Sequence, residues 1–160
     1  MKTEFRKATL PRELPSLLAF DRRIFSKSDR IASADWKTYE SYWLFVDDKK
    51  VACCAFEEHV DFQGDLRDDA NNSSRRGSLY IVTTGVLPQF QHMGFGKLLK
   101  SWEISYARYY GFTRIVTNMR SRNASMIALN LKFHFRIIRN TQKYYSDPTD
   151  STVVMELRIR

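Results

Sequence analysis

The sequence is poor in cysteine and has no long run of apolar residues, and both deficits exclude classes of protein. Its 160 residues include two cysteines, the neighbours Cys53 and Cys54. Adjacent side chains of a strand point to opposite faces, so this pair does not indicate a disulfide framework. No stretch approaches the ~18–20 apolar residues that a membrane-spanning helix needs, and the first residues lack the apolar centre of a signal peptide. We therefore expect a cytoplasmic protein without a membrane partner.

Metal-ligand spacing and the two best-known nucleotide motifs are missing as well. His59 and His134 do not stand at metal-ligand spacing from the cysteines, so no metal site is expected. A P-loop needs Ser or Thr after Gly-Lys, where this chain has Leu98. A dinucleotide fingerprint needs a third glycine, where this chain has Leu99. These differences exclude both motifs.

The composition is sufficient for one compact domain. Hydrophobic residues make up 43% of the chain and aromatic residues 14%, which can fill one core at this length. We therefore expect a single domain over residues 1–160.

The net charge of +8 is spread unevenly. Residues 97–143 hold ten Lys or Arg and one acid, whereas residues 57–69 hold six acids and one Arg. The basic region suits an anionic partner and the acidic segment suits an amine, although both patterns also fit a solvated surface.

The pattern of apolar residues predicts an α/β (α+β) fold. Apolar spacing predicts a helix after Pro11, a helical turn at residues 36–39, a long helix that ends near Gly111, and a helix capped by Asn123. Strand, helix, strand, helix and strand follow each other in the second half, which implies a partly parallel sheet. Residues 62–76 are polar and predict a long loop. The expected strands cover residues 5–9, 42–46, 51–57, 79–86, 113–118, 135–138 and 152–159.

The segment from Val86 to Lys97 joins a predicted strand to a predicted helix and carries the strongest functional signal. It contains Gly94 and Gly96 just before the helix. The N-terminus of a helix presents unpaired N–H groups and a partial positive charge, and glycines let a diphosphate approach the backbone. The segment therefore predicts a site for an anionic, phosphate-bearing ligand.

The same segment, Gln91-His92-Met93-Gly94-Phe95-Gly96, carries a family resemblance. It follows a Val-x-Pro strand end, and Asn123-Ala124 comes one strand later. This combination resembles motifs A and B of the GCN5-related (GNAT) N-acetyltransferases, from about Tyr80 to the C-terminus. The resemblance implies the GNAT fold, with a mixed sheet of six to seven strands and about four helices, and acetyl-CoA as cosubstrate. It implies that the cofactor is bound by Gly85, Val86, Leu87, Gln91, His92, Met93, Gly94, Phe95, Gly96, Lys97 and Asn123.

Within the superfamily the chain is most similar to the protein N-terminal acetyltransferase branch, which acetylates peptide α-amines. The similarity rests on the strand from Tyr80 and on Tyr144 and Tyr145. It implies that Tyr80 assists deprotonation of the amine and that the two later tyrosines line the peptide entrance. The chain departs from the family pattern at Asn118, where members often have Glu or His. It also departs at Asn130, where members often have Tyr. It also departs at His134, which stands at the usual Gly position.

Direct acetyl transfer needs a neutral amine, a donor for the developing oxyanion and a proton for the leaving thiolate. We expect Tyr80 to act as the base through water, with Glu57 as the second candidate, and the Val86 amide or its neighbour to contact the oxyanion. We expect Tyr144 and Tyr145 to line the substrate groove, and either of them, with Tyr145 as the candidate catalytic residue, could instead protonate the thiolate. Amides do not exchange protons at neutral pH but can orient a substrate. The expected substrate-binding residues are Tyr144, Tyr145, Asn118 and Asn130.

Three alternatives remain open at this point. The basic region suggests nucleic-acid binding, although its charges share no periodic face and no nucleic-acid-binding motif is present, so we do not favour this partner. A domain that binds acetyl-CoA without transferring acetyl would explain Asn118 and Asn130. The acceptor could also be a small amine that the acidic segment attracts. The oligomeric state is not predicted.

Overall fold

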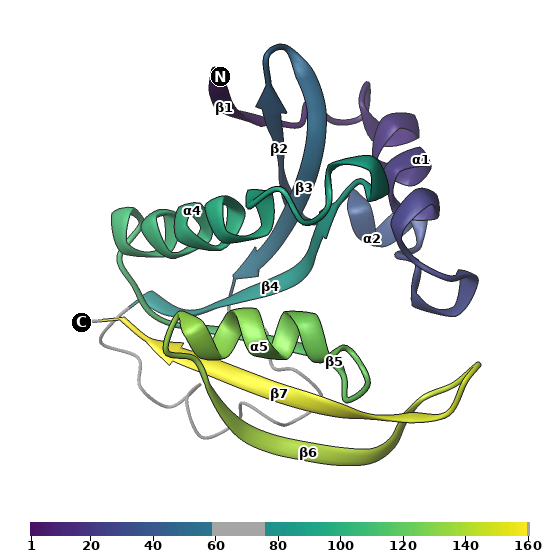
Figure 1. Ribbon diagram of the computed structural model, residues 1–160, viewed down its shortest axis with the longest axis vertical. Coiled ribbons are helices and arrows are strands. Elements are labelled where there is room, and N and C mark those ends of the chain that lie inside the picture. Colours follow the sequence, from purple (N-terminus) through teal and green to yellow (C-terminus); the bar gives the residue numbers. More distant parts are fainter. Residues whose placement is uncertain (59–75, 160) are drawn as a thin grey trace. The chain divides into compact units, whose positions relative to one another are not determined.

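The computed structural model describes residues 1–58 and 76–159. This part of the chain contains seven strands and four α-helices (Figure 1). The strands form one sheet in the order β1-β2-β3-β4-β5-β7-β6. This architecture confirms the expected mixed α/β class. The strands are β1 (Thr3–Lys7), β2 (Glu40–Val46), β3 (Lys49–Glu58), β4 (Arg76–Val86), β5 (Phe112–Arg120), β6 (Arg136–Tyr145) and β7 (Asp150–Arg158), and the helices are α1 (Leu14–Ile24), α2 (Ser33–Trp36), α4 (Phe95–Tyr109) and α5 (Ala124–Lys132).

The chain divides into two compact units. Unit 1 comprises Met1–Phe56 and Thr83–Leu99, and unit 2 comprises Glu57–Val82 and Lys100–Arg160. Strand β4 and helix α4 each contribute residues to both units. The expectation of a single domain over residues 1–160 stays a prediction.

The N-terminal strands of unit 1 form a meander. Strand β1 pairs antiparallel with β2, and β2 pairs antiparallel with β3. The β2–β3 hairpin turns at Asp47 and Asp48, whose φ angles are +46° and +64°. Two consecutive positive φ angles fit the tight hairpin turn that matches strand twist, and Asp is one of the residues that tolerates this conformation. The strands expected at residues 42–46 and 51–57 thus pair as a hairpin.

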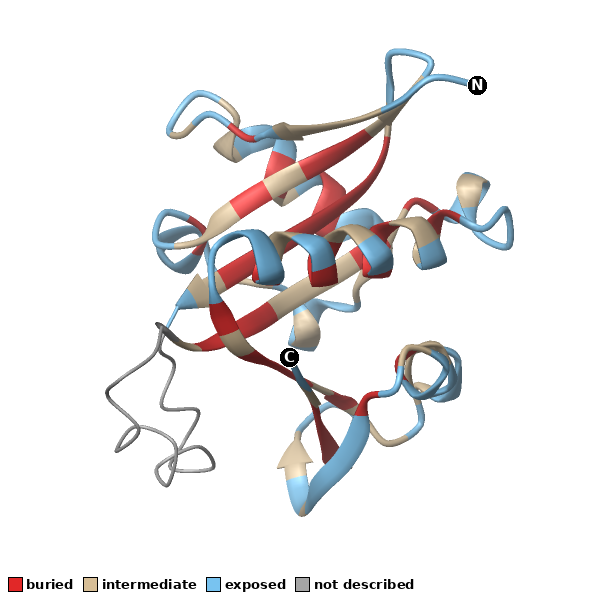
Figure 2. Ribbon diagram, turned by 90° about the vertical axis from the view of Figure 1, so that its left-hand side faces the viewer, coloured by how far each residue is buried: buried red, intermediate tan, exposed pale blue. Residues whose placement is uncertain are grey.

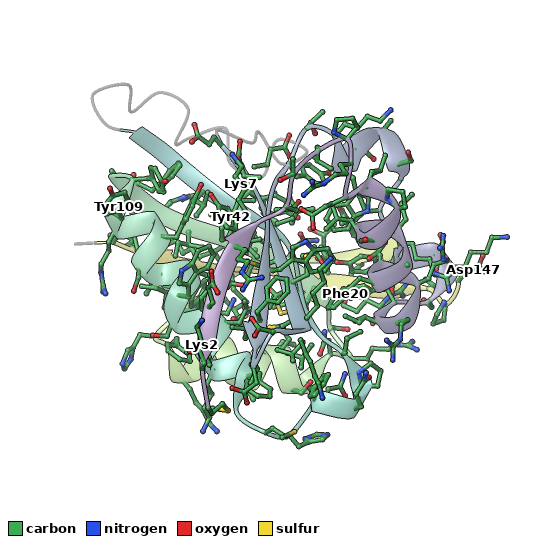
Figure 3. All side chains as sticks on the ribbon, turned by 90° about the horizontal axis from the view of Figure 1, so that it is seen from above. Lys2, Lys7, Phe20, Tyr42, Tyr109 and Asp147 are labelled. Atoms are coloured by element: carbon green, nitrogen blue, oxygen red, sulfur yellow. The ribbon has the colours of Figure 1, made fainter. Side chains whose placement is uncertain are left out.

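Helix α1 packs its apolar face onto these strands. Leu17 and Phe20 are buried on the helix, and Trp43 and Leu44 are buried on β2. The Phe20 and Trp43 rings meet edge to face with centroids 5.3 Å apart, and Figure 3 labels Phe20 on α1. Cys53 and Cys54 are free and buried on β3. Burial of apolar area contributes about 25 cal/mol per Å², so these buried side chains stabilise unit 1.

Unit 2 holds the parallel part of the sheet. Strands β4 and β5 pair in parallel, which confirms the prediction of a partly parallel sheet, and β7 pairs antiparallel with both β5 and β6. Tyr80, Val116 and Val154 come from three adjacent strands and form a buried cluster. The register of these strands therefore decides which side chains meet in the centre of unit 2.

Helix α4 follows the glycine-containing loop, as the sequence predicts. Figure 2 shows buried and exposed residues recurring along it. Phe95, Leu99, Ile104 and Ala107 are buried, which is the spacing of one helical face. The helix ends before Gly111, whose φ of +77° fits a C-terminal cap.

Several predicted boundaries differ from the structure. The first strand covers residues 3–7 rather than 5–9, because its pairing with β2 ends at Lys7. The predicted helical turn lies at Ser33–Trp36 rather than at residues 36–39. Strand β6 runs to Tyr145 rather than to residue 138, because pairing with β7 extends a polar segment as strand. Of the predicted loop at residues 62–76, only Arg76 lies within the described residues, as the first residue of β4.

Candidate functional site

The first candidate site is the loop between β4 and α4 in unit 1. After Val86 the chain makes a short 3-10 turn at Pro88–Phe90 and enters α4 at Phe95. His92 and Gly94 both have positive φ angles, +63° and +88°. Residues 91–94 are exposed, and Met93 keeps 62% of its surface accessible. The loop is thus open to a ligand on the side of the helix N-terminus.

Hydrogen bonds hold this loop to the end of β4. The Gln91 side chain donates from Nε2 to the Val86 carbonyl oxygen over 3.1 Å. The Leu87 N–H donates to the Val51 carbonyl oxygen over 2.9 Å. Phe95 is buried, and its ring lies edge to face with that of Phe90 at 6.4 Å. The Gln91 side chain therefore fixes the loop to the end of β4.

Gly85 and Gly94 of this region lie in different surroundings. A Cβ on Gly85 would lie 2.7 Å from Ile24 Cδ1, so a larger residue there would displace the Ile24 side chain of α1 within unit 1. A Cβ on Gly94 would meet no atom within 4 Å, but its φ of +88° disfavours any other residue. The open space over Gly94 is the kind of surface that a diphosphate can approach.

The start of α4 fits an anionic group. The first N–H groups of a helix have no intrahelical acceptor, and the first helical bond here runs from the Leu98 N–H to the Gly94 carbonyl oxygen. The N–H groups of Phe95, Gly96 and Lys97 precede it in this turn. The Lys97 side chain is exposed and adds a positive charge. These residues fit the pyrophosphate of acetyl-CoA, which bears negative charge.

The second candidate site is a cluster of polar side chains in unit 2. The Tyr80 hydroxyl donates to Asn118 Oδ1. Asn118 Nδ2 donates to the Tyr145 hydroxyl oxygen over 2.9 Å and to Thr152 Oγ1 over 3.1 Å. The Thr152 hydroxyl donates to the Met119 carbonyl oxygen over 3.3 Å. The structure thus brings together Tyr80, Asn118 and Tyr145, which the sequence predicts as site residues. These three residues and Thr152 are called the polar network below.

Local geometry of β6 directs Tyr145 into this network. The pairing of β6 with β7 shifts register between Thr141 and Tyr145, and Lys143 has a φ of +52°. Such a bulge re-aims the side chains that follow it. The Tyr144 and Tyr145 rings lie edge to face at 4.9 Å. The two tyrosines predicted from the sequence therefore contact each other, and Tyr145 also reaches Asn118.

Two polar residues support the end of β6. The Arg120 guanidinium lies 4.6 Å from the Tyr145 ring centre and donates to the carbonyl oxygens of Ser146 and Pro148 over 2.9 and 2.6 Å. Asp150 accepts from the Ser121 hydroxyl over 2.5 Å, and this hydrogen bond lowers the pKa of the Asp150 carboxyl. Arg120 and Asp150 thereby hold the turn between β6 and β7 beside Tyr145.

Other predicted site residues lie outside the polar network. Glu57 is half-buried near the end of β3. Asn123 caps α5, since its side chain accepts from the Met126 N–H, which confirms the predicted cap. Asn130 is fully buried, with Nδ2 3.8 Å from Met119 Sδ and 3.7 Å from Met155 Sδ. The assignments of Asn123 to the cofactor and of Asn130 to the substrate stay predictions.

Sequence reasoning missed Thr152 and Arg120. Thr152 is completely buried on β7, and a threonine at the start of an apolar strand gives no functional signal by itself. Arg120 belongs to a basic region, which is more readily interpreted as a solvated surface. The registers of β5 and β6 against β7 bring these residues to Tyr145 and Asn118.

His59 and most of the acidic segment at residues 57–69 lie outside the described residues. Among the residues that the structure describes, no three His, Cys, Asp or Glu side chains gather as ligands for a metal ion. Within the same residues, no helix has the length and apolar character to cross a bilayer.

Comparisons with known proteins agree with this geometry. Residues 12–135 match the family model of the acetyltransferase (GNAT) family. No sequence among curated proteins matches the chain. The ribosomal-protein-S18-alanine N-acetyltransferase of Escherichia coli superposes with a TM-score of 0.79 at 18% identity, over 99% of this chain and 94% of that one. NAA60 of Arabidopsis thaliana in complex with acetyl-CoA gives 0.82 at 18% identity over 99% of both chains, and Ard1 of Thermoplasma volcanium gives 0.76 at 17% identity over 100% and 99%.

Proposed function

The chain belongs to the acetyltransferase (GNAT) family of acetyl-CoA-dependent N-acetyltransferases, and we propose that its acceptor is the α-amine of a peptide or protein. The observation that carries the proposal is the polar network, in which three hydroxyls surround the Asn118 amide. An α-amine has a reference pKa near ~8 against ~10.4 for lysine. A proton path made of hydroxyls and water suits the more acidic of these amines. The fold is also similar to that of the ribosomal-protein-S18-alanine N-acetyltransferase, whose name specifies an alanine of a protein as acceptor. This similarity supports the same choice.

The cosubstrate-binding part of the site is assigned to unit 1. Bound acetyl-CoA supplies an acetyl thioester as the electrophile. We assign its pyrophosphate to the backbone N–H groups of the loop and of the first turn of α4, with Lys97 adding positive charge. The loop residues in this assignment are Gln91, His92, Met93, Gly94, Phe95 and Gly96. Fixed N–H groups stabilise an anion at little reorganisation cost.

The end of β4 is assigned to the pantetheine arm and to the oxyanion. Gly85, Val86 and Leu87 form this end of the strand. Since the Leu87 N–H already donates to Val51, the oxyanion contact falls to the Val86 N–H. Tyr80 lies on the same strand, five residues before Gly85.

We propose acid–base roles for members of the polar network and for Glu57. Tyr80 is the first candidate for taking the amine proton, through a water molecule, and Glu57 is the second. Tyr145 is the candidate for protonating the thiolate, and Tyr144 lines the peptide entrance beside it. Asn118 and Asn130 are proposed to contact the substrate or to orient groups that do. The two free cysteines support a reducing, cytoplasmic location for this chemistry.

The acceptor class is tested by measuring release of the CoA thiol in the presence of acetyl-CoA and different amines. One peptide has a free α-amine and no lysine, its partner has a blocked N-terminus and one lysine, and a polyamine represents small acceptors. We expect the first peptide to react at least about tenfold faster than the second at pH 7.5, since a larger fraction of its amine is neutral. Transfer confined to the polyamine would contradict the peptide assignment. Binding of acetyl-CoA without transfer to any amine would contradict the enzymatic one.

A further inference from the structure

Arginines from three strands converge on one buried carboxylate in unit 2. Glu156 lies on β7, and its side chain is 2% exposed. Arg114 Nη1 donates to Glu156 Oε2 over 2.9 Å. Arg136 donates to Oε1 from Nε over 2.8 Å and from Nη2 over 2.5 Å, and Arg158 Nε lies 3.5 Å from the same oxygen. These four residues are called the arginine cluster below.

Strand pairing brings the cluster together. Strands β5, β7 and β6 are neighbours in the sheet (Figure 1). Arg114 of β5 lies directly opposite Arg158 of β7, and Glu156 lies directly opposite Arg136 of β6. Glu156 and Arg158 are two positions apart, so their side chains share one face of the sheet. Like charges directly opposite each other are destabilising, so this register gathers positive charge at an electrostatic cost.

The exposed side of the cluster has more positive charge than its carboxylate balances. The Arg136 and Arg158 side chains are 66% and 63% exposed. Among the residues that the structure describes, Glu156 is the acid that forms ion pairs with them. These arginines alone therefore bring two positive charges to one negative charge. Arg114 is buried and also donates to Ser78 Oγ over 2.9 Å, and the excess on the exposed side does not depend on how its charge is balanced.

We propose that the arginine cluster binds a phosphate dianion, as the free ion or as a phosphate monoester, through Arg136 and Arg158. The two guanidiniums contact the same Glu156 oxygen, so they lie close enough to bind one oxyanion together. A guanidinium has more N–H donors than these contacts use, and its planar fork matches phosphate oxygens. A phosphate monoester carries a charge of about −1.5 to −2 at pH 7, which offsets the excess. Glu156 holds Arg136 at two nitrogens, so less freedom is lost on binding.

The compactness of the cluster favours a single phosphate over a nucleic-acid backbone. Nucleic acids are bound by basic residues that spread along a face and neutralise successive phosphates. Here the arginines converge on one carboxylate, and the basic region at residues 97–143 shares no periodic face. The residues assigned to the pyrophosphate of acetyl-CoA belong to unit 1, whereas the cluster belongs to unit 2. The inference is therefore independent of the proposed function.

The phosphate site is tested with Arg158→Gln and inorganic phosphate. Arg158 has the longest contact with Glu156, so its replacement leaves the two shorter ones in place. Thermal unfolding is measured in sodium phosphate, and in sodium chloride and sodium acetate at matched ionic strength. An ion that binds the folded state raises Tm. We expect the rise in phosphate to be smaller for Arg158→Gln than for wild type, and to correspond to an affinity about tenfold weaker, as for the loss of one charge-assisted hydrogen bond.

The matched control is Arg108→Gln, which removes the same charge at an exposed position of α4 in unit 2. Its rise in Tm with phosphate should equal that of wild type. Phosphate bound in unit 1 and the general stabilisation by phosphate salts act on all three proteins alike, so they cancel in the comparison. Without phosphate, Arg158→Gln should be at least as stable as wild type, because it removes a charge in excess.

Equal rises in Tm for Arg158→Gln and Arg108→Gln would overturn the site. A lower Tm of Arg158→Gln without phosphate would show that Arg158 serves only as an ion-pair partner of Glu156. A rise that chloride or acetate reproduces would overturn the assignment of phosphate. Single-stranded DNA that binds more tightly than phosphate, and less tightly to Arg158→Gln, would show a nucleic-acid site instead. The amine series tests the transferase assignment separately.

Discussion

Asp21 is a carboxyl group buried on α1 of unit 1. Its Oδ2 accepts a hydrogen bond from the Ile31 N–H over 2.8 Å, which ties the segment after α1 back to the helix. Burial raises the pKa of Asp21 above its ordinary value, against the opposing effects of this hydrogen bond and of Arg30. The folded state therefore holds the Asp21 proton more tightly than the unfolded state does.

Replacing Asp21 by Asn should consequently stabilise the protein at neutral pH. The amide oxygen can still accept from Ile31, and no charge is buried. Because the folded pKa is raised, the wild type is favoured below the unfolded value of about 3.9 and loses stability as pH rises through the folded value. Tm of Asp21→Asn should exceed that of wild type at pH 7, and the difference should shrink toward pH 4. The exposed Asp35→Asn controls for loss of a carboxylate, and a lower Tm for Asp21→Asn at pH 7 would contradict the interpretation.

At the scale of elements, α4 contains an ion pair that is almost fully buried in unit 2. Lys100 Nζ lies 2.7 Å from Glu103 Oε2, and the two side chains are 1% and 0% exposed. The ammonium also lies 5.2 Å from the ring centre of Phe135. Removing one partner from such a pair leaves a buried charge without its counter-charge, whereas replacing both with apolar residues is often neutral.

We therefore expect Lys100→Met and Glu103→Gln each to lower the free energy of unfolding by about 3–5 kcal/mol. The double variant Lys100→Met/Glu103→Leu should lie within about 1 kcal/mol of wild type. Urea denaturation measures all three. The exposed pair of Lys7 and Glu40 provides the comparison, since Glu40→Gln should cost less than about 1 kcal/mol. Single variants in α4 that cost no more than Glu40→Gln would show that the pair is not buried in solution.

Elements differ in how much of them the sequence predicts. Helix α4 was predictable because its apolar residues recur at helical spacing and Gly111 marks its end. Strand β6 was predictable only in its first residues, because it is exposed along most of its length and has no alternating pattern. Its extent comes from pairing with β7, which depends on residues that follow it in the chain.

For the candidate site, the loop from Gln91 to Gly96 could be predicted because its chemistry is local. A strand end, two glycines and a helix start are adjacent in the sequence. The polar network could be predicted in part: Tyr80, Asn118 and Tyr145 were named, but not as hydrogen-bonded partners. Their contacts depend on the registers of β4, β5, β6 and β7, which join residues up to 38 positions apart. Thr152, which accepts from Asn118 Nδ2, carries no signal of its own.

At the scale of the whole molecule, the proposed acetyl transfer depends on binding of acetyl-CoA by the loop at the start of α4. Two glycines allow a matched test. Gly94 and Gly111 lie before and after α4, both have positive φ angles, and a Cβ on either would meet no atom within 4 Å. A tryptophan at either position therefore carries a similar backbone strain, but only Gly94→Trp covers the proposed pyrophosphate site.

The most direct measurement is calorimetric titration of acetyl-CoA into wild type, Gly94→Trp and Gly111→Trp, with thermal unfolding of each protein as the check on folding. We expect micromolar binding to wild type and Gly111→Trp, and affinity at least about a hundredfold weaker for folded Gly94→Trp, a difference of about 2.7 kcal/mol. Wild-type protein that does not bind acetyl-CoA, or Gly94→Trp that binds it as tightly as Gly111→Trp, would contradict the assignment of acetyl-CoA to this loop.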